Sequence, residues 1–131
     1  MFFPPAVVVH GLDQARAALR PGLPVTLLSA RGAALYAGCG WWRALVEQAG
    51  AAHDILDCAD APGYAMAALR IGQRHLILDA ACPGFAAVAA AAATIGARLL
   101  AERPEALDLA ERGADRRLLA WLDRDNAKRL G

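Results

Sequence analysis

The polar side chains of this chain gather at one kind of position, just after short apolar runs. Each run has the length of a buried strand, and ligands of open α/β folds bind where parallel strands end. The residues at these positions are His10, Ser29, Arg31, Asp57, Cys58, Asp60, Asp79, Cys82, Glu102 and Arg103. We expect any binding site in this polar rim.

Two Pro-Gly turns suggest what such a site would bind. Pro62-Gly63 and Pro83-Gly84 each follow a predicted strand and begin a predicted helix. Proline suits the first helical position because its φ is already helical and it has no amide to leave unbonded. Free amides at helix N-termini attract anions. We therefore expect a small anionic ligand near Gly63 and Gly84, although the Asp60 carboxylate opposes it at the first turn. The predicted ligand-binding residues are His10, Ser29, Arg31, Asp57, Asp60, Gly63, Asp79, Cys82 and Gly84.

Cysteine chemistry is the competing hypothesis. Cys39 and Cys82 lie close to predicted helix starts, where a thiolate is stabilised, and His10 or His53 would supply the base. Cys58 lies within a predicted strand, which is typical of a core residue. Three cysteines without C-x-x-C spacing argue against a disulfide framework and a zinc knuckle. The alternative function is a small cysteine-dependent enzyme using Cys82 or Cys39.

Other ligand classes lack the residues that they need. The three histidines show no metal-binding spacing, so we expect no metal. The loop 31–40 is rich in glycine but lacks the G-x-G-x-x-G order and the Walker A lysine, so we expect no nucleotide cofactor. The net charge is +1 and the arginines are scattered, whereas nucleic-acid binding needs clustered cations. We expect no nucleic-acid partner.

An internal repeat indicates the elements that position the rim. Residues 56–76 and 78–100 share a Leu-Asp pair, a Pro-Gly pair and an Ile-Gly pair in the same order. Each copy predicts a strand, a loop, a helix and the start of the next strand, an alternation that is typical of a parallel sheet. The copies should therefore be adjacent parallel βα units, with Asp57 and Asp79 at carboxyl ends of strands.

The rest of the chain follows the same alternation. Strands are predicted at 6–10, 24–29, 54–58, 75–79 and 97–101, and helices at 12–19, 40–49, 62–71, 83–95 and 115–128. This predicts one α/β domain, 1–131, with a three-layer open sheet of about five parallel strands in the flavodoxin-like order 2-1-3-4-5. Five strands cannot close a TIM barrel, and a dimeric half-barrel is the alternative.

The predicted helix 83–95 bears on assembly, because it contains no charged residue and its outer side is alanine. A helix without a polar face is normally buried all round. One face covers the sheet, and a second copy of the chain is the simplest cover for the other, which predicts a homodimer. The alternatives are a helix covered by its own chain, or a helix coated with exposed alanine. As to function, an accessory subunit of an unseen complex is a further alternative.

The N-terminal sequence and the apolar runs bear on localisation. The first five residues lack the basic region of a signal peptide, and the longest apolar run, 85–93, is too short to span a membrane. We expect a cytoplasmic protein with no membrane partner.

Overall fold

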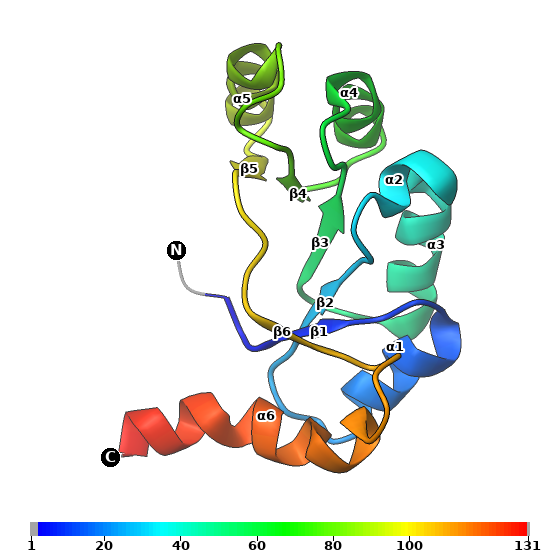
Figure 1. Ribbon diagram of the computed structural model, residues 1–131, viewed down its shortest axis with the longest axis vertical. Helices are drawn as coiled ribbons and strands as arrows, with labels where there is room; N and C mark the ends of the chain where they lie inside the picture. Colours follow the sequence, from blue (N-terminus) through cyan, green and yellow to red (C-terminus); the bar gives the residue numbers. More distant parts are fainter. Residues whose placement is uncertain (1–2, 131) are drawn as a thin grey trace. The chain divides into compact units, whose positions relative to one another are not determined.

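The computed structural model describes the backbone of residues 3–130 and the side chains of residues 3–124. It has an α/β fold with a sheet of six parallel strands, in the order β5-β4-β3-β2-β1-β6, flanked by helices (Figure 1). Contacts divide the chain into two units. We call residues up to 28, 45–54 and from 104 onward the terminal unit, and residues 29–44 and 55–103 the central unit.

The terminal unit is built on three short strands. β1 (Ala6–Val8) pairs in parallel with β2 (Thr26–Leu28) on one side and with β6 (Ala106–Asp108) on the other. The middle row of this ladder, Val7, Leu27 and Leu107, is buried. Consecutive rows of a parallel ladder point to opposite faces, so this row forms one apolar face.

Two helices belong wholly to the terminal unit. α1 (Leu12–Leu19) joins β1 to β2 and buries small side chains only. α6 (Ala114–Leu130) follows β6 and buries Leu118 and Leu122, while the Trp121 Nε1–H donates to the Ala6 carbonyl at 2.8 Å.

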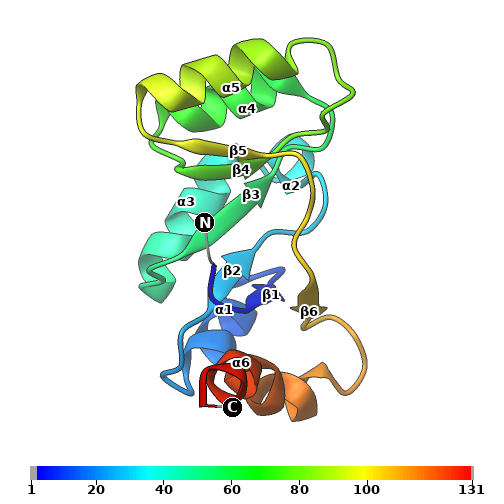
Figure 2. The same cartoon turned by 90° about the vertical axis from the view of Figure 1, so that its left-hand side faces the viewer.

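The central unit is built on β3 (Asp54–Asp57, of which Asp54 belongs to the terminal unit), β4 (His75–Ile77) and β5 (Arg98–Leu100). α4 (Pro62–Arg70) joins β3 to β4, and α5 (Phe85–Thr94) joins β4 to β5. Successive strands are neighbours, so right-handed crossovers place both helices on the same face. Figures 1 and 2 both show α4 and α5 side by side over this part of the sheet.

Two further helices follow β2. α2 (Ala33–Tyr36) lies within the segment predicted as a glycine-rich loop, and α3 (Cys39–Ala49) follows it. α2 was not predicted because it is a single short turn between glycines. Its N-cap Gly32 has φ +71°, a conformation that glycine adopts without strain.

The α/β class and the open, flavodoxin-like arrangement of parallel strands are confirmed, with six strands in place of five. The detailed order differs from 2-1-3-4-5, because β1 lies between β2 and β6 and β3 follows β2. The sixth strand was missed because Ala106–Asp108 contains one large apolar residue, a signal too short to stand out. That the chain forms one domain stays a prediction.

The internal repeat is confirmed as a pair of adjacent parallel βα units. Its copies are offset along the sheet, because Asp57 pairs with Ile77 and not with Asp79. Asp79 therefore lies two residues beyond the end of β4. The offset leaves Asp57 only 1% exposed, while Asp79 is exposed.

No helix among the described residues is long and apolar enough to cross a membrane.

Candidate functional site

A cavity of about 510 Å³ opens at the carboxyl ends of the strands of the central unit. This volume is within the range of small-molecule sites, and its position is the usual one in open α/β sheets. The cavity is lined by Arg31, Asp57, Ala59, Asp60, Ile77, Asp79, Ala101, Glu102 and Arg103.

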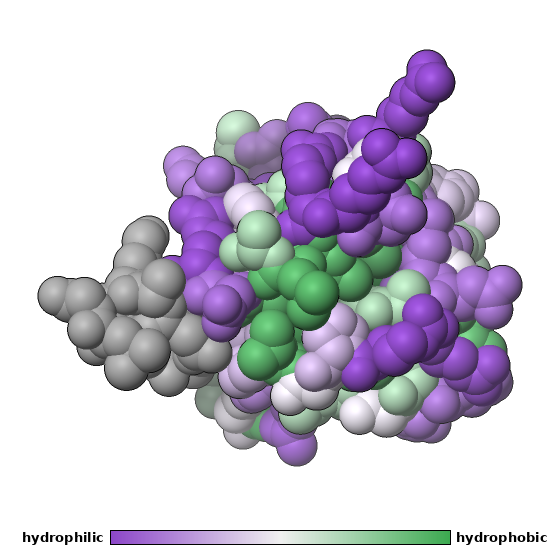
Figure 3. Space-filling view, turned by 90° about the horizontal axis from the view of Figure 1, so that it is seen from below, coloured by the Kyte–Doolittle hydropathy of each residue, from purple (hydrophilic) through white to green (hydrophobic). Residues whose placement is uncertain are grey.

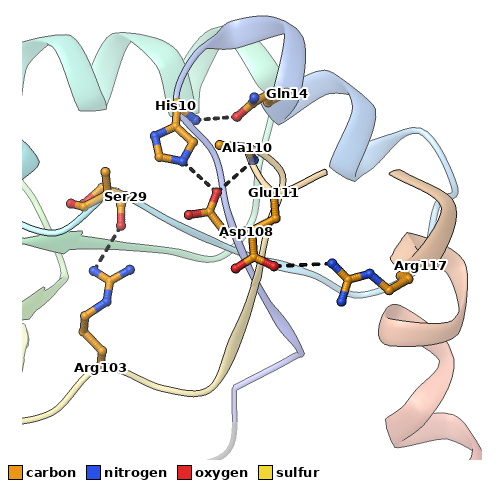
Figure 4. Close-up of polar contacts among 9 residues, drawn as sticks. His10, Gln14, Ser29, Arg103, Asp108, Ala110, Glu111 and Arg117 are labelled. Carbon is orange, nitrogen blue, oxygen red and sulfur yellow. Dashed lines mark hydrogen bonds and ion pairs between the residues drawn. The ribbon is translucent and has the colours of Figure 1, made fainter. Parts of the chain in front are cut away.

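A partly buried ion pair lies in the wall of this cavity. The Arg103 Nη1 donates to Asp57 Oδ2 at 2.7 Å. The same nitrogen donates to the Ser29 carbonyl at 3.2 Å (Figure 4). The Asp57 side chain is 2% exposed and that of Arg103 is 28% exposed. These bonds join the segment after β5 to Ser29 and to the end of β3, so they fix the guanidinium in one place.

The remaining hydrogen-bonding capacity of Asp57 is used by the backbone. Its Oδ1 accepts from the Gly32 amide at 3.0 Å and from the Ala59 amide at 2.8 Å. The Ser29 hydroxyl accepts from the Asp57 amide at 2.9 Å and donates to the Ala30 carbonyl at 3.0 Å. The polar atoms of both side chains hold the loops around the cavity, and the prediction that these side chains bind ligand stays a prediction.

Ala59 has a strained backbone at the cavity wall. Its φ is +50°, a left-handed conformation that is costly for any residue with a Cβ. Hydrogen bonds hold it there, because its amide donates to Asp57 and its carbonyl accepts from the Asp79 amide at 2.8 Å. Alanine is not a turn residue, so the sequence carried no signal for this position.

Several charged groups on the cavity lining have unused hydrogen-bonding capacity. Arg31, Asp60 and Glu102 are exposed and make no hydrogen bond or ion pair with another described residue. Arg103 uses Nη1 alone, so its Nε and Nη2 have no hydrogen bond to a described residue. Asp79 uses one of its carboxylate oxygens, because its Oδ1 accepts from the Ala81 amide at 2.9 Å.

The two Pro-Gly turns adjoin each other, as the repeat predicted. Gly84 has φ +90°, and a Cβ built there would lie 3.5 Å from the Cβ of Pro62. α4 and α5 therefore begin side by side, without side-chain caps. Gly63, Gly84 and Cys82 are not part of the cavity lining, so an anion at these amides stays a prediction.

His10 belongs to the terminal unit, where it forms a second acid–base pair. Its Nε2 lies 2.7 Å from Asp108 Oδ1, which also accepts from the Ala110 amide at 2.9 Å (Figure 4). The His10 amide donates to Gln14 Oε1 at 2.8 Å. The pair lies at the carboxyl ends of β1 and β6, where the strand order reverses. A smaller cavity of about 320 Å³ adjoins His10 and the start of α1.

The cysteines do not form a reactive group with a histidine inside the central unit. Burial, and to a lesser degree the neighbouring Asp57 and Cys39, raise the pKa of the Cys58 thiol to about 12, so this thiol is protonated at neutral pH. Cys39 and Cys82 are half-buried free thiols. The histidine of this unit, His75, begins β4, at the opposite end of that strand from Cys82.

The described residues contain no group of three or more His, Cys, Asp or Glu side chains that could hold a metal ion. The predicted rim included Glu102 and Arg103, but the predicted ligand-binding residues left them out. Their place on the cavity depends on the path of the chain after β5, which a local pattern does not encode.

No protein-family model matches this chain, and no curated protein matches it in sequence.

Proposed function

We propose that the central unit binds a small anionic ligand at the carboxyl ends of its strands, through Arg31 and Arg103. The observation that carries the proposal is that both guanidinium groups have unused hydrogen-bond donors. Both line the cavity, Arg31 has no partner among the described residues, and Arg103 has two nitrogens without hydrogen bonds. Guanidinium groups bind carboxylate and phosphate oxygens in pairs of parallel hydrogen bonds.

Arg103 is suited to this role because it is already held in position. Asp57 and the Ser29 carbonyl fix Nη1, so little side-chain freedom is lost when a ligand binds the other nitrogens. Asp57 offsets the charge of Arg103, and Asp60, Asp79 and Glu102 repel an anion. We therefore expect weak binding of a bare anion, on the order of millimolar.

Binding of inorganic phosphate and acetate, followed by the shifts of backbone amide resonances, tests the proposal. We expect the Gly32 and Ala59 amides to shift in the wild type and not in Arg31→Gln. Arg103→Lys keeps a cation beside Asp57 but loses the planar fork, so it should also weaken binding. Arg112→Gln is the matched control, since Arg112 is an exposed arginine of the terminal unit. Shifts confined to the strand starts near His53 and His75 would contradict the proposal.

The chain is also proposed to self-associate through the helices of the central unit. α2, α4 and α5 contain a single charged residue, Arg70. Ala86, Ala87, Ala90 and Ala93 of α5 are exposed, so the described residues of the central unit leave these side chains uncovered. Among the described residues, most large apolar side chains that are exposed belong to this unit, namely Leu35, Tyr36, Trp41, Tyr64, Ile71 and Ile95.

A second copy of the chain is the partner that fits this face best, because two identical uncharged faces need no complementary charge to pack together. A specific interface should bury on the order of 1,000 Å² in total or more. Ala90→Arg should dissociate the dimer and leave the fold intact, whereas Ala120→Arg, at an exposed alanine of α6, should leave the dimer intact. Ala89 is half-buried, which makes it the poorer test position. A wild-type monomer at tens of micromolar in light scattering would contradict self-association.

The cysteine-dependent enzyme remains the second candidate, because Cys39 and Cys82 are partly accessible free thiols. Iodoacetamide at neutral pH separates the two readings. A reactive thiol is alkylated in the native protein at a rate far above that of free cysteine, and a structural thiol is not.

An accessory role in a larger complex and a cytoplasmic location stay proposals. The cytoplasmic location is supported by three unpaired cysteines.

A further inference from the structure

We infer that the ligand of the central cavity is a zwitterion, a small molecule that carries an amine as well as an anionic group. This inference rests on the proposed anion site and extends it to the class of ligand. It starts from the charges of the cavity lining, which are four carboxylates and two guanidiniums.

One carboxylate and one guanidinium are already paired with each other. Asp57 and Arg103 are joined at 2.7 Å, and Asp57 uses its other oxygen on two backbone amides. The lining therefore keeps an excess of carboxylates after this pair is set aside. Asp60 and Glu102 have no partner among the described residues, so their charges are available to a ligand.

A bare anion cannot satisfy this lining, because it would gain from Arg31 and Arg103 and be repelled by the carboxylates. A bare cation would meet the opposite conflict. A ligand with both charges places each beside groups of opposite sign, which strengthens both sets of contacts. Ala59, Ile77 and Ala101 add an apolar surface suited to a short carbon skeleton between the charged ends.

A divalent cation is the other occupant that carboxylates suggest. The described residues contain no cluster of three ligating side chains, so the carboxylates of the cavity are not arranged as a metal site. Amines are satisfied by one or two carboxylates and require no such coordination sphere.

Three probes of equal chain length test the inference: 4-aminobutanoate, butanoate and butylammonium. Binding is followed at the amides of Gly32 and Ala59, which donate to Asp57 beside the cavity. We expect 4-aminobutanoate to bind at least tenfold more tightly than either singly charged probe. In Asp60→Asn/Glu102→Gln this advantage should be lost, while butanoate binds as well as before or more tightly. Glu47→Gln, at an exposed carboxylate of the terminal unit, should change nothing.

The outcomes separate the inference from the proposed function. If butanoate binds as tightly as 4-aminobutanoate and Arg31→Gln abolishes both, the anion site stands and the zwitterion inference is wrong. If butylammonium binds as tightly as 4-aminobutanoate and is insensitive to Arg31→Gln, both the anion site and the inference are wrong. The expected Kd is about a millimolar. If none of the three probes shifts the Gly32 and Ala59 amides at a concentration 50-fold above that value, the anion site and the zwitterion inference are both wrong.

Discussion

The two units each hold an acid–base pair where parallel strands end, and they bury these pairs to different degrees. In the central unit, the Asp57 side chain is 2% exposed and the Arg103 side chain 28% exposed. In the terminal unit, His10 is 37% exposed and Asp108 33% exposed. The distance between the paired atoms is 2.7 Å in both cases. Equal distances therefore do not imply equal contributions to stability, since solvent screens the exposed pair more than the pair whose carboxylate is buried.

The helices of the two units also differ, in the number of charged residues that they carry. α1 and α6 carry charges along their solvent sides, and α6 adds ion pairs from Arg117 to Glu111 and from Arg124 to Glu105. α2, α4 and α5 carry only Arg70. Exposed apolar surface alone does not separate the units, because Leu119 of α6 is 62% exposed. Figure 3 likewise shows hydrophobic residues in the middle of the face seen from below, surrounded by hydrophilic ones. The near absence of charge is what distinguishes α2, α4 and α5, and it is the basis of the proposed self-association.

The largest effect is expected from removing the buried carboxylate. Asp57→Ala leaves Arg103 and two backbone amides without their acceptor, and should lower the free energy of unfolding by about 3–5 kcal/mol. Asp57→Asn keeps an oxygen for the amides and should lose less. Urea denaturation measures both. Equal stability of Asp57→Ala and the wild type would show that the pair contributes nothing.

The next effect is a loss of stability in alkaline solution. Burial raises the pKa of Cys58 from 9.0 to about 12, so the folded state holds a proton between these values that the unfolded state has lost. Stability should therefore fall by about 1.4 kcal/mol per pH unit as the pH rises above 9, and be unaffected by this group below that. Cys58→Ala should lack this component of the slope. Parallel stability curves of the two proteins between pH 9 and 11 would rule the effect out.

A gain in stability of about 1 kcal/mol is expected from Ala59→Gly, because glycine adopts a φ of +50° without strain. The hydrogen bonds of the Ala59 backbone are unchanged by the substitution. Ala61→Gly, at a neighbouring residue with φ −109°, is the control and should destabilise. A melting temperature that falls in Ala59→Gly would show that the left-handed conformation is not strained.

The smallest effect is expected at the exposed pair. His10→Ala should cost less than about 1 kcal/mol, because a solvent-exposed hydrogen-bonded pair contributes little even when both of its groups are charged. Thermal unfolding of His10→Ala beside Asp57→Ala tests the comparison directly. A loss at His10 as large as that at Asp57 would overturn the distinction between the pairs.

The repeat shows how far local pattern determines this fold. The Leu-Asp and Pro-Gly positions predicted adjacent parallel βα units, and the structure has them, because strand and helix periodicity are local properties. The same pattern treated Asp57 and Asp79 as equivalent. Only the register between β3 and β4 makes one buried and the other exposed, and register depends on the pairing of whole strands.

The sequence by itself determined the alternation of elements, the polar rim at the strand ends and the adjoining Pro-Gly turns. Tertiary structure alone decided that β6 pairs with β1, with Ala106 beside Ala6, and that Arg103 reaches Asp57 across 46 residues. It also decided that Ala59 adopts a left-handed conformation. The physical reason is the same in each case. Periodicity and turn chemistry act over a few residues, whereas these features arise from contacts between segments that meet only when the sheet has formed.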